Sequence, residues 1–567
     1  MPAGGYFGRA LVVDVTDGTS TALPLPEEVL RAYVGGAGLG AWLLYGLGPA
    51  GADPLGPDAP LAFVFSPLVG TPLTTSAKFA VVAKSPLTGM LTDALASSQF
   101  AIAGKLTGHD AIVVRGRSST LSMLLIDGDG VRVSDAAGLA GLSAADADSK
   151  LRDQLGRGWR VAAIGPAGET GPGGEAGVRY ATISHDGRHA GRGGLGAVMG
   201  AKNLKAIAVR AATKVATAHP GEVLAFARDL RERSFGPATA KYRELGTLAN
   251  LLAFNAISTL PTRNFQSATF EGADRLGAET PGGAHGAGDA EAGPPPEIGG
   301  MRRVARSSCA SCTIGCEHIY RVGGGKKTRV EYENVFALGP MCGVSDPEAV
   351  LAASARCDDL GIDTISAGGT IAWGMECAER GLIDAPWLRF GDGAALLRAL
   401  DLIGAQEGLG ALLAQGSRRA AEVVGQGSIT FAPQVKGLEL PGYEPRTLHA
   451  MALGLAVNAR GADHNRSGAY EADLSGEHDR LNGGAAHVAA TVGTEDRAAV
   501  MDSMILCKFL RGVFEDPFTE WAGLLRAVTG WDVDAAELRA VARRIVLAKR
   551  VFNQREGATA ADDTLPP

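Results

Sequence analysis

The sequence predicts an α+β protein in which a β-rich N-terminal part precedes two mainly α-helical parts. Short apolar or alternating runs, separated by glycine, proline or Asp-Gly turns, dominate residues 1–212. From about residue 213 onward, apolar residues recur at helical spacing. A chain of 567 residues is too long for a single hydrophobic core. We therefore expect three domains, at 1–212, 213–436 and 437–567.

Seven runs in the first part have the length and apolar content of strands. One short helix over 26–33 is expected to precede a glycine-rich turn at 35–40. Such a glycine-rich run indicates dinucleotide binding only where it follows a strand, so a Rossmann domain is not predicted. The predicted strands are 10–15, 61–65, 79–82, 111–114, 123–126, 160–164 and 206–209.

Helix signals mark the remainder of the chain. One face of a helix over 219–233 is apolar. Asp346 is a good N-cap for the next long helix, and Gly361 is a C-cap glycine at its end. The low-complexity segment 281–300 is expected to be a surface insertion. Further helices are predicted over 364–380, 392–406, 485–511 and 535–552.

Composition argues against several classes of function. The formal net charge is −7, which provides no electrostatic basis for binding nucleic acid or an anionic membrane. The sequence has no apolar run of about 18 residues that would predict a membrane span, and its N-terminus lacks the features of a Sec signal. The seven cysteines are sparse and clustered, which favours metal binding in a reducing compartment. We expect a cytoplasmic protein.

Cys309, Cys312 and Cys316 form a C-x2-C-x3-C motif near the middle of the chain. On one tight turn and short helix, their sulfurs can converge on a single inorganic group. Soft thiolates at this density select zinc or iron–sulfur. Three ligands are one short of a closed site, so a fourth is sought elsewhere. The remaining cysteines are Cys342, Cys357, Cys377 and Cys507.

Two segments of the N-terminal part combine small residues with a cation. Residues 74–79 contain Lys78, and residues 191–200 contain Arg192. Small residues let backbone N–H groups and a cation meet a flat, anionic ligand. Two tight turns between strands would have the same composition, and composition alone favours the turns.

A pattern of aspartate, two residues, a turn position and an aliphatic residue occurs twice. The first copy runs from Asp358 to Asp363, and the second from Asp502 to Cys507. Each copy places a carboxylate at a helix end, where it can accept hydrogen bonds from a ligand. Two copies indicate two similar ligands in pseudo-symmetric positions. Because the second copy ends at Cys507, that cysteine is a candidate for the missing fourth metal ligand.

Together these motifs resemble those of the tungsten-containing aldehyde:ferredoxin oxidoreductase family, and the resemblance covers nearly the whole chain. It rests on KSPLTG at 84–89, AGRGGLGAVMG at 190–200, RGADH at 460–464, the cysteine motif and the two Asp motifs. The resemblance implies a β-rich pterin-binding base and two helical domains. It also implies a [4Fe-4S] cluster beside a tungsten (or molybdenum) ion held by two pyranopterins, with Mg²⁺ joining the pterin phosphates.

The resemblance also assigns roles to individual residues. Asp358 and Asp502 bind the two pterins, with Asp363 supporting the first, and Lys78 and Arg192 contact the cofactor. Three positions depart from the family: Lys78 replaces a frequent arginine, Leu95 a common asparagine near the magnesium, and Ile505 a glycine of the Asp motif. The implied cluster ligands are Cys309, Cys312, Cys316 and Cys507.

The family's proton chemistry maps onto Tyr332, Glu333, Tyr443 and His464. Aldehyde oxidation adds oxygen to the carbonyl carbon, and two protons leave as two electrons are taken up. A glutamate in a partly desolvated pocket can accept a proton because burial raises its pKa. A histidine can hydrogen-bond the carbonyl oxygen and relay the second proton. Without the resemblance, Glu333 would be a surface carboxylate and His464 a structural histidine.

Three hypotheses about function follow. The leading one is an enzyme that oxidises a small aldehyde to a carboxylic acid and passes electrons to ferredoxin or an iron–sulfur subunit, as a homodimer or hetero-oligomer. The second keeps the cofactor but makes the protein a reductase of activated acids or aromatic acyl-CoA thioesters, with Cys342 near the metal. The third is a non-catalytic scaffold stabilised by zinc on the four cysteines.

Overall fold

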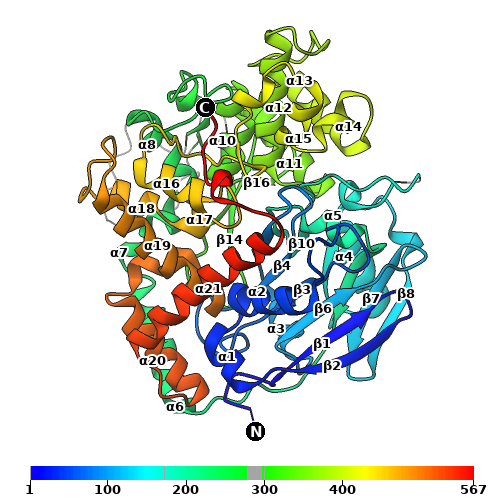
Figure 1. Ribbon diagram of the computed structural model, residues 1–567, viewed down its shortest axis with the longest axis vertical. Helices are drawn as coiled ribbons and strands as arrows, with labels where there is room; N and C mark the ends of the chain where they lie inside the picture. Colours follow the sequence, from blue (N-terminus) through cyan, green and yellow to red (C-terminus); the bar gives the residue numbers. More distant parts are fainter. Residues whose placement is uncertain (1, 172, 278–296, 299–300, 323) are drawn as a thin grey trace.

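The computed structural model describes residues 2–567 apart from 172, 278–296, 299–300 and 323. Strands of the N-terminal part gather at the lower right of Figure 1, and helices of the later chain lie above them and along their left side. The predicted α+β class is confirmed. Most of the low-complexity segment 281–300 lies outside the described residues. None of the described helices is long and apolar enough to cross a membrane.

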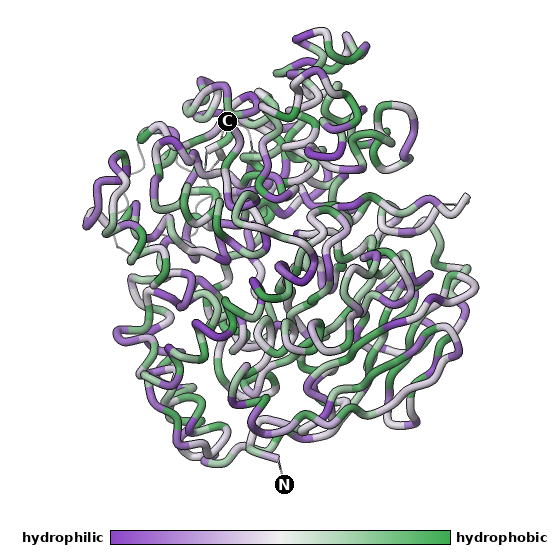
Figure 2. Tube along the Cα trace, in the orientation of Figure 1, coloured by the Kyte–Doolittle hydropathy of each residue, from purple (hydrophilic) through white to green (hydrophobic). Residues whose placement is uncertain are grey.

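The N-terminal part contains two six-stranded sheets, in the orders β2-β1-β6-β3-β4-β5 and β11-β10-β9-β12-β7-β8. Side chains from both sheets meet in one hydrophobic core, and hydrophobic residues extend along much of these strands in Figure 2. Helix α4 covers the outer face of the second sheet. Along β9, Val161 and Ala163 face α4, whereas Ala162 and Ile164 face the shared core.

The elements of this part have the following bounds. The strands are β1 Arg9–Asp14, β2 Thr19–Pro24, β3 Leu61–Val64, β4 Lys78–Lys84, β5 Leu91–Ser97, β6 Ala111–Arg115, β7 Ser122–Asp127, β8 Gly130–Asp135, β9 Arg160–Ile164, β10 Ile183–His185, β11 Arg188–Ala190 and β12 Leu204–Val209. The helices are α1 Glu27–Tyr33, α2 Gly36–Leu47, α3 Gln99–Lys105, α4 Ala144–Leu155 and α5 Leu195–Gly200.

All seven predicted strands are confirmed, as β1, β3, β4, β6, β7, β9 and β12. Five strands escape prediction: β2, β5, β8, β10 and β11. Strands β2 and β8 lie at sheet edges and are mostly exposed, and β10 and β11 span three residues each. Such strands lack the apolar period that identifies a buried one.

The glycine-rich turn expected at 35–40 is wrong, because these residues begin helix α2. The glycines let α2 approach its neighbours closely. A Cβ on Gly40 would clash with the side chain of Val82 on β4, and one on Gly38 would lie 2.9 Å from Ser503 Oγ on α19. The glycine-rich run therefore serves helix packing, and no Rossmann domain is predicted from it.

The predicted helices are confirmed as α1, α6, α11, α12, α13, α19 and α21, although α19 ends at Met504 and not near residue 511. Asp346 caps α11 by accepting a hydrogen bond from Glu348 N–H at 3.1 Å, and Gly361 ends it with a φ of 74°. The helices of this part are α6 Pro220–Arg233, α7 Pro237–Glu244, α8 Asn250–Ala256, α9 Ala273–Leu276, α10 Tyr332–Leu338, α11 Pro347–Leu360, α12 Thr364–Glu379, α13 Gly393–Ala405, α14 Leu409–Leu413, α15 Ser417–Val424, α16 His449–Val457, α17 His464–Ser467, α18 Tyr470–Leu474, α19 Ala485–Met504, α20 Pro517–Thr529 and α21 Ala535–Arg555.

The short helix expected around Cys309–Cys316 is wrong. The three cysteines lie in the loop of a β-hairpin between β14 (Met301–Ser307) and β15 (Glu317–Arg321). With β13 (Glu297–Ile298) and β16 (Thr328–Arg329) these strands form a four-stranded sheet inside the helical part. A second small sheet pairs β17 (Gln434–Val435) with β18 (Leu438–Glu439).

Two hydrophobic cores hold the helical part together. One joins α10–α13 to residues of 438–472, and the other joins α6 to α19, α20 and α21. The C-terminal helices also enter the core of the β-rich part, through Ile505, Trp531 and Phe552. Residues on both sides of position 436 thus share one core, and the end of the chain closes against its beginning.

Candidate active site

A cavity of about 550 Å³ lies where the β-rich part meets the helices. Every residue to which the family resemblance assigns a role in binding the cofactor or cluster or in proton transfer lines it. These residues come from β4 and the loop after β11, from α10, α11, α17 and α19, from the cysteine hairpin, and from residues between or next to the later helices. They are Lys78, Arg192, Cys309, Cys312, Cys316, Tyr332, Glu333, Asp358, Asp363, Tyr443, His464, Asp502 and Cys507.

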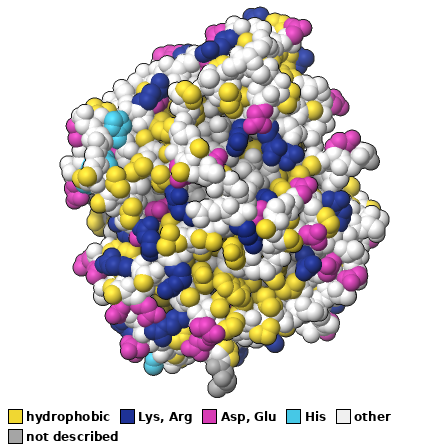
Figure 3. Space-filling view, in the orientation of Figure 1, with side chains coloured by type: hydrophobic (Ala, Val, Ile, Leu, Met, Phe, Trp, Pro, Cys, Tyr) yellow, Lys and Arg dark blue, Asp and Glu magenta, His cyan; other side chains and the backbone are white. Residues whose placement is uncertain are grey.

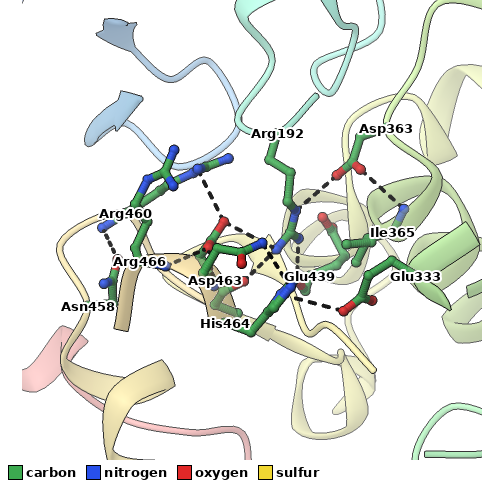
Figure 4. A network of polar contacts seen from close by, with 12 residues as sticks. Arg192, Glu333, Asp363, Ile365, Glu439, Asn458, Arg460, Asp463, His464 and Arg466 are labelled. Carbon is green, nitrogen blue, oxygen red and sulfur yellow. Dashed lines mark hydrogen bonds and ion pairs between the residues drawn. The ribbon is translucent and has the colours of Figure 1, made fainter. Parts of the chain in front are cut away.

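Two short helices bring Glu333 and His464 face to face. Glu331 caps α10 and so places Glu333 in its first turn, while Asp463 caps α17, whose first residue is His464. His464 Nδ1 lies 3.5 Å from Glu333 Oε1 (Figure 4). The other carboxylate oxygen, Glu333 Oε2, accepts a hydrogen bond from Gly442 N–H at 3.0 Å.

Burial acts in opposite senses on these two groups because one is an acid and the other a base. It raises the pKa of Glu333 to about 8 and lowers the pKa of His464 to about 3. Asn465 Nδ2, which can only donate, lies 2.9 Å from His464 Nε2. His464 is therefore a neutral imidazole whose proton sits on Nδ1, on the side that faces Glu333.

Three tyrosines complete the wall around this pair. The Tyr443 ring stacks on His464 and on Tyr470, with centroids 4.9 Å apart in each pair, and the His464 and Tyr470 centroids lie 6.2 Å apart. The Tyr332 hydroxyl donates to the Gly442 carbonyl. The stack fixes the plane of the imidazole, so the Nδ1–Glu333 contact does not depend on a mobile side chain.

Arg192 joins three segments of the chain behind this pair (Figure 4). Its Nε donates to Asp363 at 3.2 Å, and its two terminal nitrogens donate at 2.6 Å to the carbonyls of Ala462 and Glu439. Asp363 is itself the N-cap of α12, accepting from Ile365 and Ser366 N–H. Both side chains are thus already engaged, so they hold the cavity wall in shape.

A second charged network lies next to it. Arg466 bonds Asp93 at 2.6 Å and lies 3.2 Å from Asp502, while Arg460 lies 3.2 Å from Asp463. Burial opposes ionisation of Asp463, but the neighbouring arginines outweigh it and hold its pKa well below its usual range. Buried charges of this kind persist only when paired, and here each carboxylate has at least one arginine.

The two Asp motifs have the same backbone form. Asp358 lies three residues before Gly361, the left-handed C-cap of α11, and Asp502 lies three residues before Ile505, the C-cap of α19. Ile505 adopts a φ of 66°, close to the 74° of Gly361, although its side chain is β-branched. Replacing glycine by isoleucine therefore leaves the shape of this turn unchanged. The carboxylates differ, because Asp358 faces His189 and Asp502 faces Lys508 and Arg466.

The four cysteines of the expected cluster share one wall of the cavity. Burial and the nearby Cys507 raise the pKa values of Cys312 and Cys316. Burial lowers the pKa of Lys78, but the sulfurs of Cys507 and Cys309 outweigh it and raise the value overall. Among the residues that the structure describes, no three His, Cys, Asp or Glu side chains converge closely enough for a single metal ion. A cubane cluster takes its thiolates on separate irons and so accepts wider spacing.

The wall of the cavity holds polar atoms that lack hydrogen-bond partners within the described residues. Leaving a buried polar atom unpaired costs about 1–3 kcal/mol, so such atoms mark the place of a polar ligand. Their number and variety fit a large, highly polar cofactor with phosphate and ring nitrogen atoms. They are Thr75 Oγ1, Arg188 Nε, Glu333 Oε1, Arg460 Nε, His464 Nδ1 and Asp502 Oδ2.

Cys342 does not reach this cavity. It is fully buried in the core of the middle helices, and its thiol donates to the carbonyls of Ala337 and Gly368 at 3.4 and 3.6 Å. Cys357 and Cys377 are also core residues. The three thiols pack as small apolar side chains.

Both parts of the chain match models of one known protein family. Residues 10–211 match the family described as "Aldehyde ferredoxin oxidoreductase, N-terminal domain", and residues 226–567 match "Aldehyde ferredoxin oxidoreductase, domains 2 & 3". The chain belongs to the aldehyde ferredoxin oxidoreductase family. It is therefore an oxidoreductase.

Members and relatives of the aldehyde ferredoxin oxidoreductase family match this chain over most of its length. Proteins of Pyrococcus furiosus and Thermococcus kodakarensis named tungsten-containing aldehyde ferredoxin oxidoreductase are each 33% identical, over 99% of this chain and 91% of theirs. The WOR-like subunit of an aliphatic sulfonate oxidoreductase of P. furiosus is 28% identical over 82% of this chain and 76% of its own. The solved active-site complex BamBC of benzoyl coenzyme A reductase, with 1,5-dienoyl-CoA, has a TM-score of 0.83 at 23% identity, over all of this chain and 91% of that one. This last likeness shows the fold alone.

Several residues of the aldehyde ferredoxin oxidoreductase site escape sequence reasoning. Arg188 pairs with Glu331 at 2.7 Å beside the cysteine hairpin, and Arg466 joins Asp93 to Asp502. Tyr470 extends the ring stack. The motif at 460–464 indicates the network only in part, because Asp93, the partner of both Arg460 and Arg466, lies hundreds of residues away in sequence.

Proposed function

We propose that this chain oxidises an aldehyde to a carboxylic acid at a tungsten (or molybdenum) bis-pyranopterin centre and passes the electrons through a [4Fe-4S] cluster. The observation that carries the proposal is the buried Glu333–His464 pair, which opens onto the same cavity as four cysteine sulfurs. A carboxyl group with a pKa near 8 is suited to exchange protons at neutral pH.

The unpaired polar atoms of the cavity and the thiols on one of its walls fit such cofactors. Cys309, Cys312, Cys316 and Cys507 would ligate the cluster, with Lys78 between the cluster and a pterin. Asp358 and Asp502 would each bind a pterin from a helix end, and Mg²⁺ would join the phosphates near Leu95. Arg192 and Asp363, which are hydrogen-bonded to each other, would hold this wall of the cavity in position. When bound, the pterin metal supplies a two-electron acceptor.

The chain's own residues handle substrate and protons. Overall, RCHO and H2O give RCOOH, two protons and two electrons. His464 donates a hydrogen bond from Nδ1–H, which polarises the carbonyl oxygen. Glu333, once deprotonated, accepts a proton at Oε1, the atom left without a partner. Tyr332 and Tyr443 hold Gly442 and the imidazole in place and keep water from the pair. General base catalysis of this kind contributes about 10²–10⁴-fold in rate.

The alternative, a reductase of activated acids or aromatic acyl-CoA thioesters, receives less support. That hypothesis places the Cys342 thiol beside the metal, whereas Cys342 lies in the helical core. Ferredoxin or an iron–sulfur subunit is the electron acceptor that we propose, with a homodimer or hetero-oligomer as the assembly and the cytoplasm as the compartment, because free thiols persist in reducing surroundings.

The test is metal analysis and electron paramagnetic resonance of anaerobically purified protein, together with a Glu333→Gln variant. We expect iron and tungsten or molybdenum in wild type and variant alike, and at least 100-fold slower aldehyde-dependent reduction of benzyl viologen in the variant. Glu348→Gln, an exposed glutamate on α11, serves as the control. Iron without tungsten or molybdenum, after growth with both metals, would contradict the proposal.

A further inference from the structure

The sheet that carries the cysteine hairpin differs in charge from the rest of the chain. Residues 301–329 contain seven arginines or lysines and a single glutamate, a formal net charge of +6 in a chain of net charge −7. On the face shown in Figure 3, by contrast, basic and acidic side chains are interspersed. The basic residues are Arg302, Arg303, Arg306, Arg321, Lys326, Lys327 and Arg329.

This basic sheet brings the cysteine loop to the surface. Ser308 and Ser311 are exposed, and Cys309 and Cys312 are partly exposed. Arg302 and Arg306, on the strand that leads into the loop, are exposed as well. A group held by these cysteines is therefore reached from solvent through a positively charged surface.

An exposed aromatic ring stands beside the loop. Phe235 is 50% exposed, and the guanidinium groups of Arg231 and Arg243 each lie 6.0 Å from its ring centroid. Ser234, its neighbour in sequence, lies 2.7 Å from the hydroxyl of Thr313 in the cysteine loop.

Hydrogen bonds tie the ring to the basic strand. Arg243 donates to the Phe235 carbonyl at 2.7 Å, and Arg306 donates to the Arg243 carbonyl at 2.9 Å. Phe235, Arg231, Arg243 and Arg306 thus form one continuous surface, and Arg302 is exposed on the same strand as Arg306. Aromatic residues and arginine are enriched at protein–protein interfaces and their binding hot spots.

We propose that Phe235, Arg231, Arg243, Arg302 and Arg306 form the docking surface for an acidic iron–sulfur protein that takes electrons from the cluster, an inference that rests on the proposed function. Opposite charge steers such a partner to the loop and raises its association rate. The phenyl ring supplies the apolar contact at the centre. Each aldehyde releases two electrons, so two molecules of a one-electron acceptor are reduced per turnover.

The experiment compares two electron acceptors on the holoenzyme. An acidic ferredoxin needs a docking surface, whereas the small dye benzyl viologen does not. In R302E/R306E the KM for ferredoxin should rise at least tenfold and lose most of its dependence on salt, while kcat with viologen stays within twofold of wild type. The double variant R157E/R398E makes the same charge change at exposed sites on the loop before β9 and on α13, and should leave both KM values unchanged.

Two further variants guard against trivial outcomes. R302Q/R306Q removes charge without reversing it and should raise the KM for ferredoxin several-fold if the reversed pair fails to fold. Phe235→Ala should raise that KM while the salt dependence remains, since its contribution is apolar.

Three results would overturn the proposal. The first is an unchanged KM for ferredoxin in R302E/R306E with normal viologen reduction. The second is an equal effect in R157E/R398E. The third is a change of sedimentation coefficient in R302E/R306E, which would assign the surface to a second copy of this chain. If the wild-type holoenzyme does not reduce benzyl viologen with an aldehyde, the proposed function itself is refuted.

Discussion

At the scale of single residues, the same burial that keeps Glu333 protonated keeps His464 neutral. The pair therefore carries no net charge at neutral pH, which lets it face a large anionic cofactor without repulsion. Its reactivity depends on one event, the loss of the Glu333 proton. Asn465 fixes which imidazole nitrogen carries the hydrogen, so the direction of the hydrogen bond is set before substrate arrives.

A pH profile follows from these two pKa values. A base must be unprotonated to act, and the unprotonated fraction of Glu333 grows as pH rises through about 8. We expect kcat/KM for aldehyde oxidation to increase with pH up to a plateau above that value. His464, with a pKa near 3, should add no limb between pH 5 and 8. Measurement from pH 5.5 to 9.5 tests this, and the residual activity of Glu333→Gln should be flat. A limb near 6.5 would show that His464 titrates in the site.

Replacing a cysteine at the cavity and replacing a cysteine in the core should affect the protein differently. Cys507→Ala should lower the iron content and abolish ferredoxin reduction with little change in the thermal midpoint, because Cys507 is partly exposed. Cys342→Ala should keep both metals and full turnover but lose about 1 kcal/mol of stability through the small cavity in the core. Iron content, turnover and thermal unfolding of the two variants separate these outcomes. Loss of the tungsten signal in Cys342→Ala would revive the reductase hypothesis.

At the scale of secondary structure, the helix ends of the two Asp motifs show what a sequence pattern can predict and what it cannot. The spacing predicts a carboxylate near each helix end, and Asp358 and Asp502 lie there. It does not predict that isoleucine takes the glycine conformation, because that depends on tertiary packing. Ile505 is fully buried against the β-rich core, and this burial offsets a backbone strain of about 1–3 kcal/mol.

Gly361 offers a test of this comparison. A Cβ there would lie 2.8 Å from Gly165 N in addition to meeting a φ of 74°. Gly381 has a similar φ of 70° with nothing within 4 Å. Gly381→Ala should therefore cost about 1 kcal/mol for backbone strain alone, and Gly361→Ala distinctly more. Equal shifts of the thermal midpoint would mean that the contact with Gly165 relaxes without cost.

The sequence predicts buried elements that have a strong apolar period, and it misses elements such as β5 that are buried but lack one. Buried strands such as β4 and β6 have a continuous apolar period, whereas β8 does not. The cysteine segment lies in a hairpin between β14 and β15, and the sequence of β14, MRRVARS, has no strong apolar period that would predict a strand. Site residues come from the motifs, but Arg188 and Arg466 act through partners distant in sequence, which no local pattern shows.

At the scale of the whole molecule, the hydrophobic cores do not follow the order of the chain. Helix α6 packs with α19, α20 and α21, and residues 438–472 pack with the middle helices. The cavity is lined by the β-rich part, by α10 to α12, by residues between 443 and 474 and by the end of α19, so its geometry depends on the chain closing on itself. We infer that the cysteine wall and the β-rich part unfold together.

Trp531 tests this coupling, because it belongs to the C-terminal helical region but lies in the N-terminal core. Its ring packs against Tyr6 with centroids 5.3 Å apart, and its Nε1 donates to Glu27 at 2.8 Å. Trp531→Ala should cost about 3–5 kcal/mol. Far-ultraviolet circular dichroism and the visible absorbance of the cluster should then be lost together, at one lowered temperature. Trp387→Ala removes a half-buried indole under Arg398 and should lower the midpoint less. Cluster absorbance that persists in Trp531→Ala after the β-sheet signal is lost would show that the two parts are separate folding units.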